Sequence, residues 1–444
     1  MPRGYKKAKT AGAARPARQF RFDESLALFQ YMLSLFGCQT LDTLCEGMKD
    51  ETWEGWDEQN ISRYYYFLTT RLFEYPGITK EQLLRYDQNI TSQTMAISGR
   101  RGAFRWKYFQ YMALLFSEIY LDKYFNDPQG LLDGLNAQVT LLNSEREAAD
   151  KLPPYVLDDL NKIAFWQATG SGKTLIMHVN ILQYRHYLAK AGKHAMLNRV
   201  ILLTPNEGLS EQHNGEFKLS SIPADIFNKE SGSLYAGQEI SIIDIHKLKE
   251  EGKEKTVSVD AFESNNLVLV DEGHRGAGGE EWMDKRNRLC SEGFSFEYSA
   301  TFGQAMKASG KKEMLHLYAK CILFDYSYKY FYGDGYGKEY SILNLAEEQH
   351  EEQRQLYLTA CLLAFYQQLK VYDGKKRELV PFNVEEPLWV FVGSKVNAVR
   401  TERGEKVSDV IDILLFLKRF LNNRPATKEF INRLLNGASQ LNDT

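Results

Sequence analysis

Short apolar segments separated by longer connections constrain the fold of this chain more than any other feature of its sequence. Five of them read KIAFWQ, RVILLTP, EISIIDI, NLVLVDE and FSFEYSAT, at residues 162–167, 199–205, 239–245, 266–272 and 294–301. Strand, connection, strand in this order is typical of an α/β fold with a parallel sheet. Each segment ends in a polar or glycine-containing cluster, and ligands of such sheets bind at the carboxyl ends of the strands. We therefore expect a ligand site where these clusters meet.

The remaining sequence divides into regions of different pattern. Residues 1–21 are basic and contain no acid, which predicts a disordered tail that is either a solvated terminus or an arm that contacts phosphates. Residues 22–99 have apolar spacing near 3.6 and predict a helical region. The sheet domain is expected at 100–325, opening with an amphipathic helix over 104–125 and a loop-rich stretch to about Pro154.

The C-terminal part predicts a connection followed by a second lobe. Residues 326–384 read as a connecting segment with a long helix. The stretch PLWVFVGSKVNAV at 387–399 predicts a buried strand that opens another α/β lobe. Because 385–444 is too short for a whole lobe, we expect that lobe to be incomplete.

Bulk composition excludes several classes of protein. The net charge is −3, so any binding to nucleic acid must come from local clefts rather than from a global positive field. The five cysteines are scattered without a C-x-x-C pair, which argues against a structural zinc site or a disulfide framework and favours a reducing cytoplasm. No apolar run reaches the length of a membrane span, so no membrane partner is expected.

The stretch IAFWQATGSGKT at 163–174 predicts a phosphate-binding loop. Its backbone N–H groups, at the junction of a strand and a helix, can face phosphate oxygens. Lys173 can reach the β- and γ-phosphates, and the Thr174 hydroxyl can bind Mg²⁺. The usual pattern G-x-x-x-x-G-K-[ST] has glycine where this chain has Gln167. None of these contacts needs that glycine, so we expect the loop to bind ATP with Mg²⁺.

Two acids follow a strongly apolar strand in NLVLVDEGHRG. Asp271 can bind magnesium, and Glu272 can orient and deprotonate an attacking water. The alternative is a helix N-cap followed by a solvated acid. The segment 299–301 (Ser-Ala-Thr) ends another strand and could equally be a hydroxyl-rich helix cap. The segment 204–206 (Thr-Pro-Asn) could contact a nucleic-acid backbone or form a loop before a capped helix.

In this combination and order, the motifs resemble those of superfamily 2 helicases and translocases. The exact forms of three motifs, ATGSGKT, DEGHRG and SATF, are similar to those of the type III restriction enzyme Res subunits. The resemblance covers roughly residues 100 to 400. The resemblance implies a RecA-like, parallel-sheet P-loop NTPase lobe followed by the start of a second one. The cofactor-binding residues it implies are Ala168, Thr169, Gly170, Ser171, Gly172, Lys173 and Thr174.

The resemblance also implies roles for the other clusters. Asp271 and Thr174 would hold the metal, while Glu272, Lys173 and His274 would be catalytic. The residues implied to couple hydrolysis to motion are Ser299, Ala300 and Thr301. Those implied to contact nucleic acid are Thr204, Pro205 and Asn206.

Families of this kind recognise adenine with a glutamine that lies upstream of the phosphate loop. Gln110, in FRWKYFQYMALL, matches that position, with Tyr108 and Phe109 as stacking partners for the base. The alternative is an exposed glutamine on an amphipathic helix.

The function implied is an ATP-dependent DNA helicase or translocase of a restriction or antiphage defence protein. Its partners would be DNA, double-stranded rather than single-stranded, and restriction–modification or defence subunits. The family's second-lobe arginine motif is not found in the sequence, so slow hydrolysis by this chain alone is expected. An RNA helicase and a nucleotide-gated switch without processive motion are the alternatives. A metabolic P-loop kinase would not account for the DEGH and SAT clusters.

Overall fold

A computed structural model gives the structure of the chain, which divides into two compact units, Met1–Lys338 and Glu339–Thr444. The structure describes residues 21–71, 77–102, 104–227, 240–248, 258–273, 280–337, 351–382, 384–391, 400–402, 405–407 and 409–436. The predicted basic tail lies outside these residues except for its last position, Arg21. Within the described residues, no helix is long and apolar enough to cross a membrane.

The first unit is built on a seven-stranded sheet in which all neighbouring strands run parallel, in the order β3-β4-β2-β5-β6-β1-β7. The strands are β1 (Lys162–Gln167), β2 (Val200–Thr204), β3 (Ala224–Ile226), β4 (Ile240–Asp244), β5 (Leu267–Asp271), β6 (Phe294–Ser299) and β7 (Ile322–Tyr326). This confirms the predicted parallel α/β sheet and its five strands. The short β3 and the last strand, β7, were not predicted. Because the strands are parallel, the clusters that follow β1, β2, β5 and β6 lie at one edge of the sheet.

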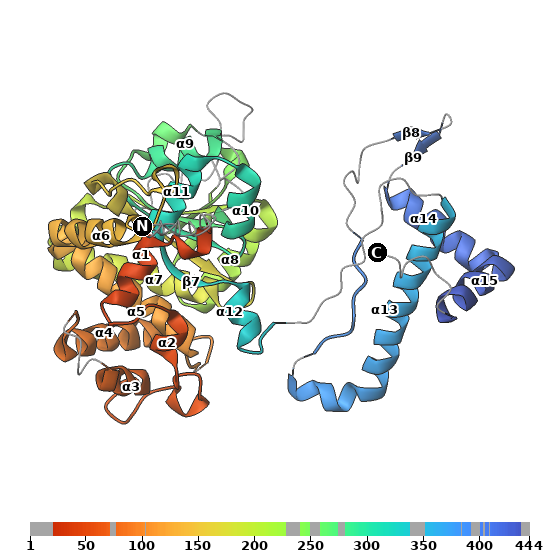
Figure 1. Ribbon diagram of the computed structural model, residues 1–444, viewed down its shortest axis with the longest axis horizontal. Coiled ribbons are helices and arrows are strands. Elements are labelled where there is room, and N and C mark those ends of the chain that lie inside the picture. The colour runs from red at the N-terminus through yellow and green to blue at the C-terminus, as the bar shows by residue number, and fades with distance from the viewer. Residues whose placement is uncertain are drawn as a thin grey trace, which may run out of the picture. The chain divides into compact units, whose positions relative to one another are not determined.

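Helices surround this sheet (Figure 1). A helical N-terminal region is present as predicted, with α1 (Ala27–Ser34), α2 (Leu41–Cys45), α3 (Arg63–Arg71) and α4 (Lys80–Ser98). The other helices of the unit are α5 (Tyr108–Asn126), α6 (Pro128–Asn143), α7 (Lys173–Lys190), α8 (Glu207–Leu219), α9 (Glu280–Leu289), α10 (Phe302–Ser309), α11 (Lys312–Cys321) and α12 (Tyr328–Gly333). The predicted loop-rich stretch to Pro154 is wrong, since α6 occupies most of it. Asp127 accepts a hydrogen bond from the Gly130 N–H and Pro128 opens the helix, which is a regular helix start.

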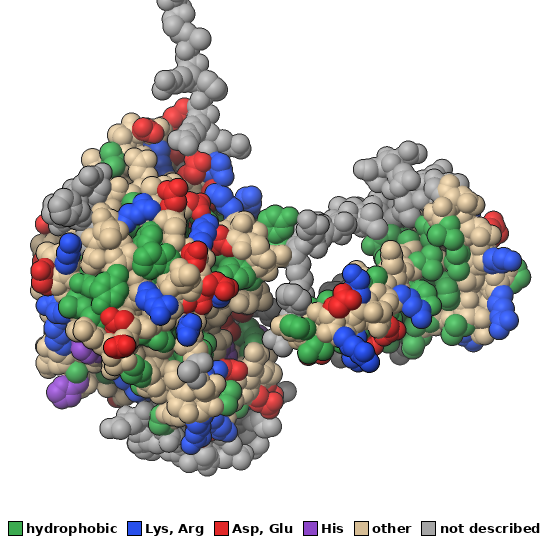
Figure 2. All heavy atoms as spheres, turned by 90° about the horizontal axis from the view of Figure 1, so that it is seen from below, with side chains coloured by type: hydrophobic (Ala, Val, Ile, Leu, Met, Phe, Trp, Pro, Cys, Tyr) green, Lys and Arg blue, Asp and Glu red, His purple; other side chains and the backbone are tan. Residues whose placement is uncertain are grey.

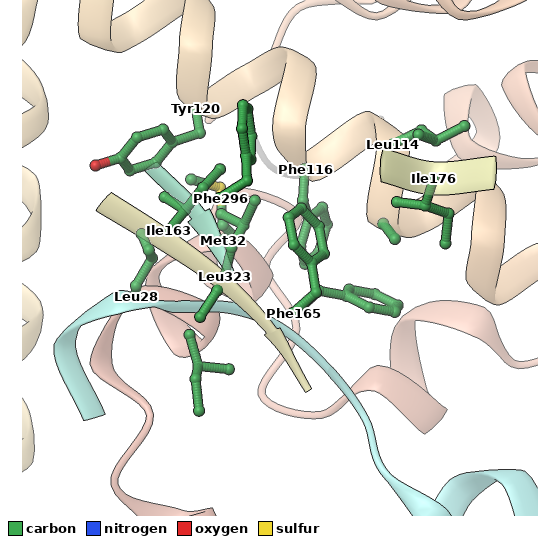
Figure 3. Packing of buried hydrophobic residues seen from close by; sticks show 14 of the residues in the cluster. Leu28, Met32, Leu114, Phe116, Tyr120, Ile163, Phe165, Ile176, Phe296 and Leu323 are labelled. Atoms are coloured by element: carbon green, nitrogen blue, oxygen red, sulfur yellow. The ribbon is translucent and has the colours of Figure 1, made fainter. Parts of the chain in front are cut away.

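One large core joins the helical region to the sheet (Figure 3). Side chains from α1, α5, α7, β1, β6 and β7 meet there, among them Leu28, Met32, Phe116, Phe165, Ile176 and Leu323. The prediction of an amphipathic helix over 104–125 is wrong, because α5 is buried on nearly every side. Helices α4 and α6, together with α7 and β7, pack around it. A helix covered all round loses the polar face that amphipathic spacing requires.

The carboxyl group of Glu118 lies in this helical core and is fully buried. It accepts hydrogen bonds from the Asn89 amide on α4 (2.8 Å) and from the Tyr187 hydroxyl on α7 (2.6 Å). Burial raises the pKa of this carboxyl to about 7. The folded chain therefore holds the proton more tightly than the unfolded chain, so the free energy of unfolding falls as the pH rises from the ordinary carboxyl pKa towards 7.

We expect Glu118→Gln to remove about 2 kcal/mol of that pH dependence between about pH 5 and about pH 8. Urea unfolding across this range measures the slope. The matched control is Glu147→Gln, because Glu147 is exposed, and it should keep the wild-type slope. An unchanged slope in Glu118→Gln would contradict the prediction.

The second unit contains α13 (Glu351–Leu379), α14 (Asp409–Asn422), α15 (Arg424–Leu435) and an antiparallel pair, β8 (Arg400–Glu402) and β9 (Glu405–Val407). The long helix is confirmed. The buried strand at 387–399 is not formed where the structure describes it, since 384–391 pairs with no described strand and Leu388 is 82% exposed. A parallel strand is buried only between neighbouring strands and covering helices. Hydrophobic side chains accordingly gather on the surface of this unit (Figure 2).

Candidate nucleotide-binding site

The segment between β1 and α7 has the backbone of a phosphate loop. Gly170 has φ 84° and Gly172 has φ 90°, in the left-handed region that glycine adopts without strain. The Ala168 N–H donates to the Tyr326 carbonyl on β7 (2.9 Å), which fixes the entry to the loop. A side chain at Gly172 would also collide with the Gln110 amide. Thr169 and Gly170 are exposed, and Thr174 is half-buried in the first turn of α7.

Lys173 begins α7 and folds back over its own loop. Its Nζ donates to the carbonyl oxygens of Gln167 (3.2 Å) and Ala168 (3.1 Å). Burial lowers the pKa of this ammonium group, and the charges of Glu272 and Asp271 oppose that effect. The charges of Asp271, the last residue of β5, and of Glu272, the next residue, thus act on the phosphate-loop lysine.

Two buried polar side chains of the loop have no partner among the described residues. These are the amide of Gln167 and the hydroxyl of Ser171, and both residues are fully buried. Buried polar groups are almost always paired, so unpaired ones call for an explanation. Together with the N-terminus of α7, they fit a site for an anionic phosphate group. Gln167 is the last residue of β1, and the turn after it still forms, with Gly170 and Gly172 in the left-handed region.

The backbone turns sharply after β5. Glu272 has φ 55°, a left-handed conformation that is uncommon outside glycine. Such strain costs on the order of 1–3 kcal/mol and clusters at functional sites. It directs the chain away from the sheet immediately after Asp271. His274 lies outside the described residues, so its predicted role stays a prediction.

His213, on α8, is a residue of this site that the sequence analysis did not single out. Its Nε2 lies 2.9 Å from Oδ2 of Asp271, and the two side chains are 5% and 13% exposed. The contact exists because β2, which precedes α8, lies beside β5 in the sheet. No sequence signal could have shown it, since strand order is not visible in a single sequence.

The segment 299–301 ends β6, between β5 and β1. The Ser299 hydroxyl accepts from the Thr301 N–H (3.0 Å), and the Ala300 carbonyl accepts from the Trp166 indole (3.2 Å). The Thr301 hydroxyl makes no capping bond to α10 and is buried without a partner among the described residues. The alternative of a simple hydroxyl cap therefore does not hold for Thr301.

The segment 204–206 connects β2 to α8. Thr204 is buried, and its hydroxyl lies 2.7 Å from that of Ser210. Because this side chain exposes no atom to solvent, it cannot contact nucleic acid in this structure. Pro205 is half-buried and Asn206 is exposed. Asn206 also caps α8 by accepting from the Leu209 N–H (2.9 Å).

Gln110 lies against the phosphate loop instead of projecting from an exposed helix face. Its amide donates to the Ser171 carbonyl (2.9 Å) and accepts from the Lys107 N–H (3.0 Å). Tyr108 and Phe109 are buried, and the Phe109 ring stacks on Tyr326 at 3.9 Å. The prediction that these two rings stack on a base is wrong in this structure, because protein groups already cover them. Recognition of adenine by Gln110 stays a prediction. It would require the Gln110 amide to exchange these two hydrogen bonds for bonds to the base.

The oxygen donors at this edge suit magnesium. Thr174 supplies a hydroxyl and Asp271 a carboxylate, and Mg²⁺ is usually bound by one or two protein oxygens together with substrate phosphates. Among the described residues, no group of three or more His, Cys, Asp or Glu side chains could hold a metal by itself. Thr174 and Asp271 therefore fit a magnesium ion that would take its remaining ligands from phosphate and water oxygens.

Residues 136–304 match the family described as "Type III restriction enzyme, res subunit". This agrees with the resemblance drawn from the motifs, and the segment 136–304 is similar to that family. No curated protein sequence matches the chain.

Two solved structures are similar to parts of the chain. The Sulfolobus solfataricus SWI2/SNF2 ATPase core in complex with dsDNA is 13% identical, with a TM-score of 0.26, over 36% of this chain and 32% of that one. The UvsW helicase from bacteriophage T4 is 14% identical, with a TM-score of 0.27, over 65% of this chain and 94% of that one. The chain thus spans about a third of the first protein. At these TM-scores neither likeness bears on function.

Proposed function

We propose, from the match of residues 136–304 to the type III restriction res-subunit family, that this chain carries the ATP-binding lobe of a DNA helicase or translocase. The observation that supports this most is the position of Lys173, half-buried at the start of α7, where its Nζ donates to the Gln167 and Ala168 carbonyl oxygens of the loop. An ammonium group, a phosphate loop and two acids at one edge of a parallel sheet are the groups that phosphoryl transfer to water requires.

In the proposed reaction, each group has one task. Lys173 exchanges its two carbonyl partners for phosphate oxygens when ATP binds. Thr174 and Asp271 would hold magnesium, which would neutralise charge on the phosphates when it is bound. Glu272 orients the attacking water and accepts its proton. The remaining donors to phosphate are the backbone N–H groups of Thr169, Gly170 and Gly172, with the Ser171 hydroxyl beside them.

The nucleic-acid side of the proposal rests on the half-buried Pro205 and the exposed Asn206, near the same edge. Pro205 and Asn206 reach the surface beside the first turn of α8 and would contact the DNA backbone. Ser299 and Thr301, with His274, would couple hydrolysis to motion. We propose double-stranded DNA as the partner and a restriction or antiphage defence system in the cytoplasm as the setting, with further subunits of that system as partners.

The proposed function predicts that Lys173→Ala weakens the binding of magnesium-ATP by about 10- to 100-fold, since a hydrogen bond to a charged group contributes about 1.5–3 kcal/mol. Equilibrium binding of a fluorescent ATP analogue measures this, and ATP turnover with and without duplex DNA accompanies it. Lys193→Ala is the matched control, because Lys193 is an exposed lysine beyond the other end of α7.

Wild-type binding with a weakened Lys173→Ala variant and an unchanged Lys193→Ala variant would support the proposal. If the wild type fails to bind ATP, or if both lysine variants bind like the wild type, the proposed function is wrong. If RNA stimulates ATP turnover and DNA does not, the proposed ATPase activity stands and the proposed DNA substrate is wrong.

A further inference from the structure

Helix α8 joins two parts of the candidate site that the sequence treats as separate motifs. It begins immediately after the segment 204–206, and its seventh residue, His213, contacts Asp271 at the end of β5. A carboxylate oxygen only accepts hydrogen bonds, so Nε2 of His213 carries the proton and donates it to Oδ2. One oxygen of the carboxylate is thereby held by α8, and Oδ1 remains for another partner.

Bonds at both ends hold α8 in place, so its position determines where the imidazole lies. At the start, Thr204 bonds Ser210. At the end, the Arg101 guanidinium donates to the Glu216 carbonyl (2.6 Å), and Ser220 bonds His178 on α7 (2.8 Å). Asn206, which caps the first turn, and His213 therefore belong to one hydrogen-bonded helix.

The second imidazole nitrogen, Nδ1, helps to decide whether His213 serves to orient Asp271 or only to fill space. Nδ1 of His213 is buried and has no partner among the described residues. A histidine retained only for packing gains nothing from this unpaired polar atom, which costs free energy when buried. The hydrogen bond from Nε2 to Asp271 is therefore the polar contact that His213 makes.

We propose that His213 is a positioning residue that orients Asp271 for magnesium and makes that orientation depend on what binds at the first turn of α8. This rests on the proposed function, in which Asp271 holds the metal and Pro205–Asn206 contact DNA. Groups that hydrogen-bond a metal ligand fix its geometry, and their loss typically lowers metal affinity by about 10- to 100-fold. His213 thereby links DNA binding to the metal-dependent part of nucleotide binding.

The test compares His213→Asn with His213→Gln. A glutamine amide reaches about as far as Nε2 and can donate to Asp271, whereas an asparagine amide stops one methylene short. The readout is the affinity for a fluorescent, non-hydrolysable ATP analogue in magnesium and again in EDTA, each with and without a duplex DNA. His194→Asn is the control, because it replaces an exposed histidine that lies on neither α8 nor β5.

We expect His213→Asn to reduce the gain in affinity that magnesium gives by about 10-fold or more, with EDTA affinities unchanged. The effect of DNA on that gain should be lost in the same variant. His213→Gln and His194→Asn should retain both. A wild-type magnesium gain in His213→Asn, or an equal loss in the Asn and Gln variants, would overturn the proposal. Failure of the wild type to bind the analogue with magnesium would instead count against the proposed function.

Discussion

Replacing Glu272 with glutamine is expected to lower the rate of ATP hydrolysis by about 10²- to 10⁴-fold, the usual contribution of a general base. The affinity for ATP should stay close to that of the wild type. The amide keeps the size of the side chain and the left-handed backbone at φ 55°, but it cannot accept the proton of the attacking water. Single-turnover hydrolysis of labelled ATP, with and without duplex DNA, measures the rate, and equilibrium binding measures the affinity.

A matched control exists elsewhere in the chain. Glu263 is also a glutamate with a left-handed backbone (φ 59°), and it is exposed, just before β5 instead of after it. Glu263→Gln should hydrolyse ATP like the wild type. Turnover near the wild-type rate in Glu272→Gln would show that another group takes the proton. A parallel loss of binding would show that Glu272 holds the nucleotide.

The fold of the first unit could be predicted wherever a strand was apolar and ended in a polar cluster. β7 was missed because its residues, ILFDY, follow α11 directly, so no turn signal separates helix from strand. α6 was missed because PQGLLDGLNAQ contains glycines and polar residues that favour loops, although Asp127 and Pro128 mark a helix start. The predicted strand at 387–399 was apolar enough, but burial depends on neighbours that no local pattern supplies.

The candidate site divides in the same way. The sequence predicts the phosphate loop and the acids after β5, because each lies in one continuous segment with fixed spacing. It could not predict the contact of His213 with Asp271 or of Gln110 with the Ser171 carbonyl. Those contacts depend on the order of strands and on how α5 packs beside α7. Burial of Thr204 likewise depends on α8 lying over the end of β2.

The stability of the sheet near this site is expected to depend on one buried ion pair, Arg286 on α9 with Glu297 on β6. Both side chains are fully buried. Glu297 also accepts from the Tyr318 hydroxyl (2.8 Å) and lies two residues before Ser299. Arg286→Met should lower the free energy of unfolding by about 3 kcal/mol. It removes the closer cation of the buried carboxylate and leaves only Lys162, whose Nζ lies 3.8 Å from Oε1 of Glu297. Urea unfolding measures the change.

Arg288→Met, on the same helix, is the control. Arg288 pairs with Asp284 at 3.8 Å on the surface, and such pairs contribute about 0–1 kcal/mol. A loss in Arg286→Met no larger than that in Arg288→Met would contradict the prediction. Adding Glu297→Gln to Arg286→Met should restore part of the stability, because it removes the buried carboxylate charge that Arg286 balanced. Lys162 keeps its hydrogen bond to Asn287 (3.4 Å) in that double variant. If the double variant is less stable than Arg286→Met, the hydrogen bond from Tyr318 to a charged carboxylate matters more than the ion pair.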